Sequence, residues 1–293
     1  MRRSAGLLRS LRPHQWGKNV FVLAALFFSG NLLETAMVSR AGIAFVAFCL
    51  LSSSVYLVND IVDRRKDQLH PIKRSRPIAA GIVSPLLAGV AALVIVLVGL
   101  GACLWLSSMT FIVGLLFATL CYLYSFWLKR IVILDVMVLA GGYALRAIAG
   151  AVAIDVSFSN WLLICSSLLA LFLGFCKRRQ ELTSLEDEAS AHRVVLESYS
   201  ETFLDQMIAV VTASTVLCYL LYAFDPLTAV KLGTPYLGLT VPFVLYGIFR
   251  YFFMVHQRGE GGRPAREVVS DLPFLINVLL YGVSVVVVLY VLP

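Results

Sequence analysis

The chain has 293 residues, of which 60% are hydrophobic and 14% are charged, and its formal net charge is +7. Soluble domains contain about 45–50% apolar and about 25% charged residues, so this composition excludes a soluble protein. It predicts an integral membrane protein instead, and the lack of period-2 alternation favours helices over a membrane β-barrel. No nucleic-acid partner is expected.

The N-terminal segment before Lys18 is basic and polar, and the first apolar stretch runs from Val20 to Leu33. No small-residue cleavage site follows this stretch, so we interpret it as a retained first helix. We expect an all-α bundle of about nine transmembrane helices around a central cavity, formed by one domain over 1–293. The expected helices lie near 19–33, 37–58, 84–106, 109–128, 131–153, 159–176, 206–225, 235–256 and 272–292.

Basic residues concentrate in alternate loops, on the same side as the N-terminus, while the opposite loops hold little beyond Arg40 and Lys231. The positive-inside rule therefore predicts a multi-pass protein of a bacterial-type plasma membrane, with its N-terminus in the cytoplasm. Two long loops on the basic side, near 59–82 and 177–205, also collect acidic residues. Membrane topology does not require acids, so we expect the chemistry in these two cytoplasmic loops.

The first of these loops opens with an ordered acidic motif formed by Asn59, Asp60, Asp63 and Asp67. If the second helix continues through Asp67, all four side chains share an arc of about 100°. Carboxylates on one face repel each other unless a cation joins them. Oxygen ligands suit Mg²⁺, which takes its remaining ligands from waters and substrate phosphates. The motif predicts a magnesium site that binds a diphosphate.

Three cations follow the acids closely, at Lys73, Arg74 and Arg76. Arginine is well shaped for bidentate contacts with phosphate. A loop that combines acidic side chains, which can bind a metal, with basic side chains, which can bind phosphate, indicates a phosphorylated substrate. The alternative is an ordinary solvated loop of mixed charge.

The motif N-D-x-x-D-x-x-x-D at the end of the second of nine helices resembles the UbiA superfamily of intramembrane prenyltransferases. The resemblance implies that Asn59, Asp63 and Asp67 bind a diphosphate through Mg²⁺, with Asp60 in the same motif. The second motif of the superfamily is usually D-x-x-x-D. Here only Asp135 is acidic and Leu139 stands at the partner position, which argues against an ordinary prenyltransferase.

Several further stretches resemble one branch of the superfamily: 11–19, 70–81, 145–150, 177–182 and 196–199. The resemblance implies an enzyme that transfers 5-phosphoribose from phosphoribosyl pyrophosphate (PRPP) to a polyprenyl phosphate of decaprenyl type, releasing diphosphate. The product would serve cell-envelope polysaccharide synthesis. Two alternatives stay open: prenyl transfer from a prenyl diphosphate to a small acceptor, and a transporter for lipid phosphates. Whether the chain forms a homo-oligomer is also open.

Arg146 is the least expected residue, because it falls inside a predicted membrane helix. It follows Asp135 by eleven positions, so both face the same way, and it lies about 16 Å further along the helix. Charges within the membrane are costly, and they are usually functional or paired. We expect either a role toward phosphate or the cavity, or a structural ion pair or a snorkel to the outer side.

The remaining candidates are assigned roles through the resemblance. Asp63, Asp67 and Asp135 are the expected catalytic residues, with Asp135 as a second metal ligand or a partner of a ribose hydroxyl. Lys177 and Glu181 are four residues apart, which is also the spacing of an ordinary surface pair. Expected substrate-binding residues, in addition to the motif and the three cations after it, are Lys18, Tyr124, Lys129, Arg146, Lys177, Arg178, Glu181 and Tyr199. The run 186–192 is interpreted as a solvated loop.

Overall fold

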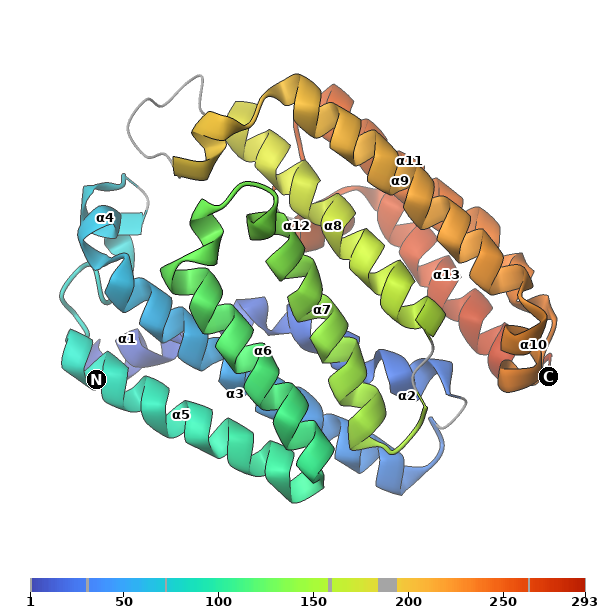
Figure 1. The fold of residues 1–293 in the computed structure, drawn as a ribbon, viewed down its shortest axis with the longest axis horizontal. Coiled ribbons are helices and arrows are strands. Elements are labelled where there is room, and N and C mark those ends of the chain that lie inside the picture. The colour runs from blue at the N-terminus through green and yellow to red at the C-terminus, as the bar shows by residue number, and fades with distance from the viewer. Residues whose placement is uncertain are drawn as a thin grey trace. The chain divides into compact units, whose positions relative to one another are not determined.

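The computed structural model describes residues 2–29, 32–71, 73–157, 160–183, 194–262 and 264–292, and within these ranges it is helical and contains no strand (Figure 1). The chain divides into two compact units. The first contains Met1–Phe27 and Asn31–Phe158, and the second contains Phe28–Gly30 and Ser159–Pro293. The expected all-α class is confirmed.

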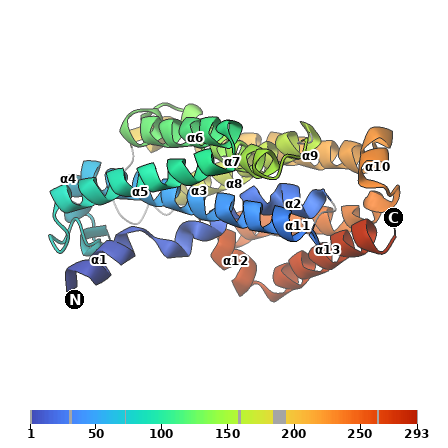
Figure 2. The same cartoon turned by 90° about the horizontal axis from the view of Figure 1, so that it is seen from below.

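The first unit is organised around one long helix, α3 (Thr35–Val62), against which η1, α5, α6 and α7 pack. Figure 2 shows α3 between α1 and α6, with α5 alongside it. The rings of Phe48 and Phe117 lie 5.0 Å apart in the apolar core between α3 and α6. The other elements of this unit are α1 (Arg2–Ser10), η1 (Pro13–Leu23), α2 (Ala24–Phe28), α4 (Arg64–Leu69), η2 (Lys73–Ser75), α5 (Pro85–Leu106), α6 (Ser108–Phe126), η3 (Leu128–Arg130) and α7 (Leu134–Ala153).

The second unit pairs α8 with α9 and α11 with α13. Asp271 precedes α13 and accepts hydrogen bonds from Arg250 and Arg258 at 2.8 and 2.9 Å. These guanidinium groups, with the backbone amide of Phe274, lower the pKa of Asp271 to about 2. The elements are α8 (Asn160–Thr183), η4 (Val194–Ser198), α9 (Glu201–Phe224), α10 (Pro226–Leu232), η5 (Tyr236–Thr240), α11 (Val241–Arg258), α12 (Pro264–Ser270) and α13 (Leu272–Tyr290).

Seven helical segments within the described residues are long and apolar enough to cross a membrane: 35–62, 85–106, 108–126, 134–153, 201–224, 236–258 and 272–290. They correspond to seven of the nine expected helices, and α8, with 24 residues, corresponds to an eighth. The expected first helix over 19–33 is wrong. Its region forms the 3₁₀ helix η1 and the five-residue α2. The apolar run of 14 residues is about 21 Å long as an α-helix, too short for a hydrocarbon core of about 30 Å.

Small polar side chains define where several of these helices begin. Ser84 accepts a hydrogen bond from the amide of Leu87 at the start of α5, and Ser107 accepts one from Thr110 at the start of α6. Such caps satisfy amides that have no partner within the helix. Ser107 is therefore both the residue that follows the end of α5 and the N-cap of α6, so it alone separates the two helices.

Gly150 of α7 allows the backbone of η1 to lie directly against α7. A Cβ atom at this position would lie 1.8 Å from the carbonyl oxygen of Val22. No side chain fits that space, and the obstructing atom belongs to the backbone rather than to a flexible side chain. The contact holds η1 beside α7 and thereby positions the polar residue Asn19, which lies one turn earlier in η1.

Arg40 joins the ends of two other helices to the start of α3. Its Nε donates to the carbonyl of Ala153 at 2.7 Å, and its Nη2 donates to the carbonyl of Leu106 at 3.0 Å. These are the last residues of α7 and α5, whose terminal carbonyls have no partner within their own helix. The positive charge is also favourable beside the negative ends of two helix dipoles.

Replacing Arg40 by alanine is therefore expected to lower the free energy of unfolding by about 2 kcal/mol, because two carbonyls lose a charged donor. Arg40→Lys, which keeps the charge but cannot donate from two separate nitrogens, should show a smaller loss. Thermal unfolding of the purified variants in detergent measures both effects. An Arg40→Ala protein as stable as wild type would contradict this assignment.

Candidate active site

The acidic motif lies at a break between two helices. Contrary to the expectation of one helix through Asp67, α3 ends at Val62 and α4 begins at Arg64. Asp63 stands between them with φ −87° and ψ 2°, outside the α-helical region. The amides of Asp63 and Asp67 still donate to carbonyls four residues back. The break therefore keeps the acids close while turning their side chains toward different partners.

Asp60 and Asp67 form one half of the site and share a cation. Arg76 donates from Nη1 to Asp60 Oδ1 at 3.1 Å and to Asp67 Oδ2 at 2.6 Å. Asp60 also accepts a hydrogen bond from Arg12 Nη2 at 2.5 Å. Both carboxylates are buried, with relative exposures of 2% and 4%. The predicted proximity of Arg76 to the acids is therefore present as direct contact.

Asn59 and Asp63 form the other half and share Lys129, which follows α6 in η3. Lys129 Nζ lies 3.0 and 2.8 Å from the two carboxylate oxygens of Asp63 and 3.3 Å from Asn59 Oδ1. Seventy residues separate Lys129 from Asn59 in the sequence. The tertiary structure brings Lys129, a predicted substrate-binding residue, into contact with two predicted metal ligands.

Arg12 is part of this site, although the sequence indicated it only as one of the basic N-terminal residues and as a member of the family-like stretch 11–19. It has φ 54°, in the left-handed region that is costly for a residue with a side chain. This conformation turns the chain between α1 and η1, and the guanidinium lies 5.1 Å from the ring centre of Tyr56 while it binds Asp60. Strain of this kind is often found at functional sites. The nearest sequence signal was Pro13, because a proline restricts the residue before it.

The charges of the site balance: Asp60, Asp63 and Asp67 face Arg12, Arg76 and Lys129. Within the described residues no three His, Cys, Asp or Glu side chains converge as a ready metal site. The donors nevertheless fit Mg²⁺, which prefers oxygen ligands and usually binds one or two carboxylates, with waters and substrate phosphates completing the set. Asn59 and Asp63 present such oxygens side by side at Lys129.

The other candidates of the first unit lie on α7, α6, η2 and η1. Asp135 is fully buried in the first turn of α7, two residues after Ile133, whose φ of 69° is unusual for a β-branched residue. Tyr124 is half-buried near the end of α6. Lys73 and Arg74 lie in η2, and Lys18 is exposed in η1.

Arg146 lies in α7 with a relative exposure of 8%, so it does not snorkel into solvent. Its Nε donates to Asn19 Oδ1 at 2.7 Å, and its Nη1 donates to the carbonyl of Gly142 at 3.0 Å. The guanidinium also lies 4.6 Å from the ring centre of Phe117 and 5.2 Å from that of Tyr143. Among the described residues no carboxylate pairs with it, so the expected ion pair is absent and neutral groups stabilise the charge.

The last four candidates belong to the second unit. Lys177, Arg178 and Glu181 were expected in a loop after residue 176, but α8 continues to Thr183 and contains all three. Arg178 is fully buried and donates to Glu181, and Lys177 Nζ lies 3.9 Å from the same carboxylate. Tyr199 is buried, and its ring stacks on Phe203. The run 186–192 lies outside the described residues.

The helices and the charged cluster at the end of α3 together define a polytopic membrane protein with an acid-rich polar site. A family model described as the UbiA prenyltransferase family matches residues 19–289. The chain belongs to this family, and it is accordingly a transferase.

Curated relatives cover most of the chain. A decaprenyl-phosphate phosphoribosyltransferase of Mycolicibacterium smegmatis is 34% identical over 91% of this chain and 87% of its own length. A protein of the same name from Mycobacterium tuberculosis is 38% identical over 75% of this chain and 74% of its own. A solved UbiA homolog from Archaeoglobus fulgidus, bound to GPP and Mg²⁺, has a TM-score of 0.71 at 18% identity and covers 96% of this chain and 99% of that one. This last likeness supports the fold.

Proposed function

We propose that the chain transfers 5-phosphoribose from PRPP to a polyprenyl phosphate of decaprenyl type and releases diphosphate, supplying a precursor of cell-envelope polysaccharide. The observation that carries this proposal is the identity of 34% to the decaprenyl-phosphate phosphoribosyltransferase of Mycolicibacterium smegmatis over 87% of its length. The site supports the same reaction class, because it combines oxygen donors for a metal with cations for phosphate.

Asn59, Asp63 and Asp67 would hold Mg²⁺ together with the diphosphate of PRPP. Bound Mg²⁺ would neutralise charge that develops on the departing diphosphate. Lys129 and Arg76, which contact these carboxylates in the structure, would donate to phosphate oxygens when substrate is present. Arg12 would hold Asp60 in its buried ionised form. Removing two charges from water is costly and a buried pair adds little stability, which favours a functional reason for this arrangement.

In the proposed reaction, an oxygen of the lipid phosphate forms a bond to C1 of the ribose. The bond between C1 and the diphosphate oxygen breaks, and its electron pair leaves with the diphosphate. The lipid phosphate is already ionised, so no strong base is needed. Positioning of the two substrates and electrostatic stabilisation of the separating charges would supply most of the acceleration.

The other predicted residues have roles that follow from the same proposal. Asp135 would contact a ribose hydroxyl or a second metal ion, and Arg146 would act on a phosphate or on the polar interior of the first unit. We propose that the active site faces the cytoplasm of a bacterial cell, because the basic loops are on that side. Further proposed contacts to the 5-phosphate, the ribose or the diphosphate are Lys18, Lys73, Arg74, Tyr124, Lys177, Arg178, Glu181 and Tyr199.

The test is to incubate the purified protein with radiolabelled PRPP, decaprenyl phosphate and Mg²⁺, and to identify the lipid product by mass spectrometry. We expect a labelled lipid whose mass exceeds that of decaprenyl phosphate by one phosphoribosyl group, together with released diphosphate. A parallel reaction with geranylgeranyl diphosphate and a phenolic acceptor tests conventional prenyl transfer. Product formation in that reaction and not in the reaction with PRPP would overturn the proposal. Transport of lipid phosphate across the membrane of vesicles without release of diphosphate would overturn it as well.

A further inference from the structure

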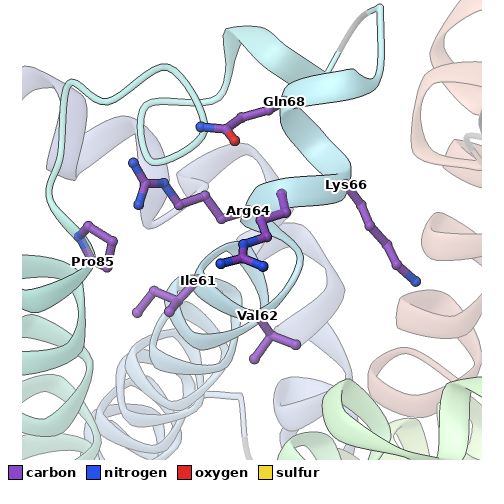
Figure 3. A pocket seen from close by; sticks show the side chains of 7 residues that line it. Ile61, Val62, Arg64, Lys66, Gln68 and Pro85 are labelled. Atoms are coloured by element: carbon purple, nitrogen blue, oxygen red, sulfur yellow. The ribbon is translucent and has the colours of Figure 1, made fainter.

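Three consecutive cations line an open pocket on the first unit, outside the cluster described above. The pocket has a volume of about 560 Å³, and Arg64, Arg65 and Lys66 contribute its charge. Gln68 adds an amide, and Ile61, Val62 and Pro85 complete the lining (Figure 3). The pocket therefore has a cationic part formed by α4 and an apolar part formed by the end of α3 and the start of α5. No carboxylate belongs to its lining.

These three cations differ from the cations of the candidate active site. Arg12, Arg76 and Lys129 each bind a carboxylate. In the part of the chain that the structure describes, neither arginine of the pocket nor Lys66 forms an ion pair. The Nε of Arg64 is in addition buried and lacks a hydrogen-bond partner among those residues. A buried N–H group without an acceptor is unfavourable, and no carboxylate among the described residues compensates the charge of this guanidinium.

An exposed aliphatic stripe begins beside the pocket and continues along α5. Leu86, which follows Pro85, is 79% exposed, and Val90, Leu93 and Leu97 are 53%, 59% and 60% exposed. Their spacing of four, three and four residues places them on one face of the helix. Because α5 is a candidate membrane span, this face is suited to lipid chains. The pocket thus lies where an apolar membrane-facing surface meets a cluster of unpaired positive charge.

We propose that this pocket binds the headgroup phosphate of an anionic phospholipid of the surrounding membrane. The guanidinium groups of Arg64 and Arg65 would contact the phosphate, and the ammonium group of Lys66 would add positive charge beside it. The acyl chains would lie along the stripe from Leu86 to Leu97. Clusters of Lys and Arg at the end of a membrane helix attract anionic lipids, and arginine suits phosphate geometry. The proposal concerns neither PRPP nor the lipid substrate, so it does not depend on the proposed reaction.

Native mass spectrometry of the detergent-solubilised protein, titrated with dioleoylphosphatidylglycerol or dioleoylphosphatidylcholine, tests this site. Wild type is expected to retain one phosphatidylglycerol selectively. The triple variant Arg64→Gln/Arg65→Gln/Lys66→Gln should lose affinity by on the order of 100-fold, since each cation contributes about five-fold. Arg130→Gln is the matched control: it removes an exposed cation next to another membrane helix and should leave the binding unchanged.

Thermal unfolding provides a second readout: phosphatidylglycerol should raise the melting temperature of wild type and of Arg130→Gln but not that of the triple variant. If the triple variant does not fold, Arg65→Gln/Lys66→Gln, which changes two exposed side chains, replaces it with an expected loss of about 25-fold. Equal retention of phosphatidylglycerol by wild type and variant would overturn the proposal. Displacement of the bound phosphatidylglycerol by millimolar inorganic phosphate would also overturn it, because the pocket would then be a site for free anions. Displacement by equimolar decaprenyl phosphate would overturn it too, because the pocket would then be a site for the lipid substrate.

Discussion

Asparagine in place of Asp63 is expected to lower the rate of phosphoribosyl transfer by about 100-fold or more. Asp63 accepts hydrogen bonds from Lys129 through both carboxylate oxygens, and in the proposed reaction it is a ligand of the metal that carries the diphosphate. Asparagine keeps the size of the side chain but removes the charge. Losing one preorganised electrostatic contact in an active site commonly costs 10²- to 10³-fold in rate, roughly the effect expected here. Initial rates with labelled PRPP at saturating lipid measure it.

Asp155→Asn is the matched control for this experiment. Asp155 is exposed at the other end of α7 and has φ 56°, a left-handed conformation that asparagine also adopts readily. Its activity and stability should equal those of wild type. The Asp63→Asn protein should also unfold close to the wild-type temperature, which separates lost chemistry from lost folding. Activity of folded Asp63→Asn within about two-fold of wild type would refute the assignment of Asp63 as a metal ligand.

Alanine in place of Gly150 is expected to destabilise the protein by about 3 kcal/mol or more, or to prevent its accumulation. The added Cβ would lie 1.8 Å from the carbonyl oxygen of Val22, so η1 has to move away from α7. Overpacking of well-packed interiors typically costs about 1–3 kcal/mol, and here the obstacle is backbone that cannot rotate aside. Displacing η1 would also separate Asn19 from Arg146 and leave the buried guanidinium with fewer partners.

Gly101→Ala provides the comparison, because Gly101 lies in α5, is exposed, and has no atom within 4 Å of the position of an added Cβ. Alanine is the better helix former by about 1 kcal/mol, so this variant should be as stable as wild type or slightly more stable. Expression level and melting temperature in detergent distinguish the two variants. Equal melting temperatures for Gly150→Ala and Gly101→Ala would contradict the close packing of η1 on α7.

Most of the membrane helices could be predicted from the sequence, because a long apolar run has few alternatives to a helix in lipid. The segments 84–106, 109–128 and 131–153 agree with α5, α6 and α7 to within a few residues. The prediction failed where the apolar run was short, at η1 and α2. It also failed where a span continued past its last apolar residue, since Lys177 to Glu181 remain helical in α8. Hydropathy identifies the lipid-embedded part of a helix and not its polar extension.

The site was predicted less completely than the helices. The acidic residues and Arg76 were identified because they are close in sequence and ordered as a motif. Arg12 was not, since its contact with Asp60 spans 48 residues and depends on a left-handed backbone conformation that no local pattern indicates. Arg64, Arg65 and Lys66 were interpreted only as markers of membrane topology, because the positive-inside rule accounts for basic residues in a cytoplasmic loop without any ligand.

The sequence by itself determined the all-helical membrane fold and the residue types of the site, because both depend on local composition and short spacing. Only the tertiary structure decided which charges neutralise each other. It divided the acidic motif into a pair that shares Arg76 and a pair that shares Lys129, since the helix breaks at Asp63 and cations from three separate segments approach from different sides. It also left the cations of α4 without acidic partners, because they line a different surface from the carboxylates. Ion pairs between distant segments depend on packing geometry, which no local pattern of the chain specifies.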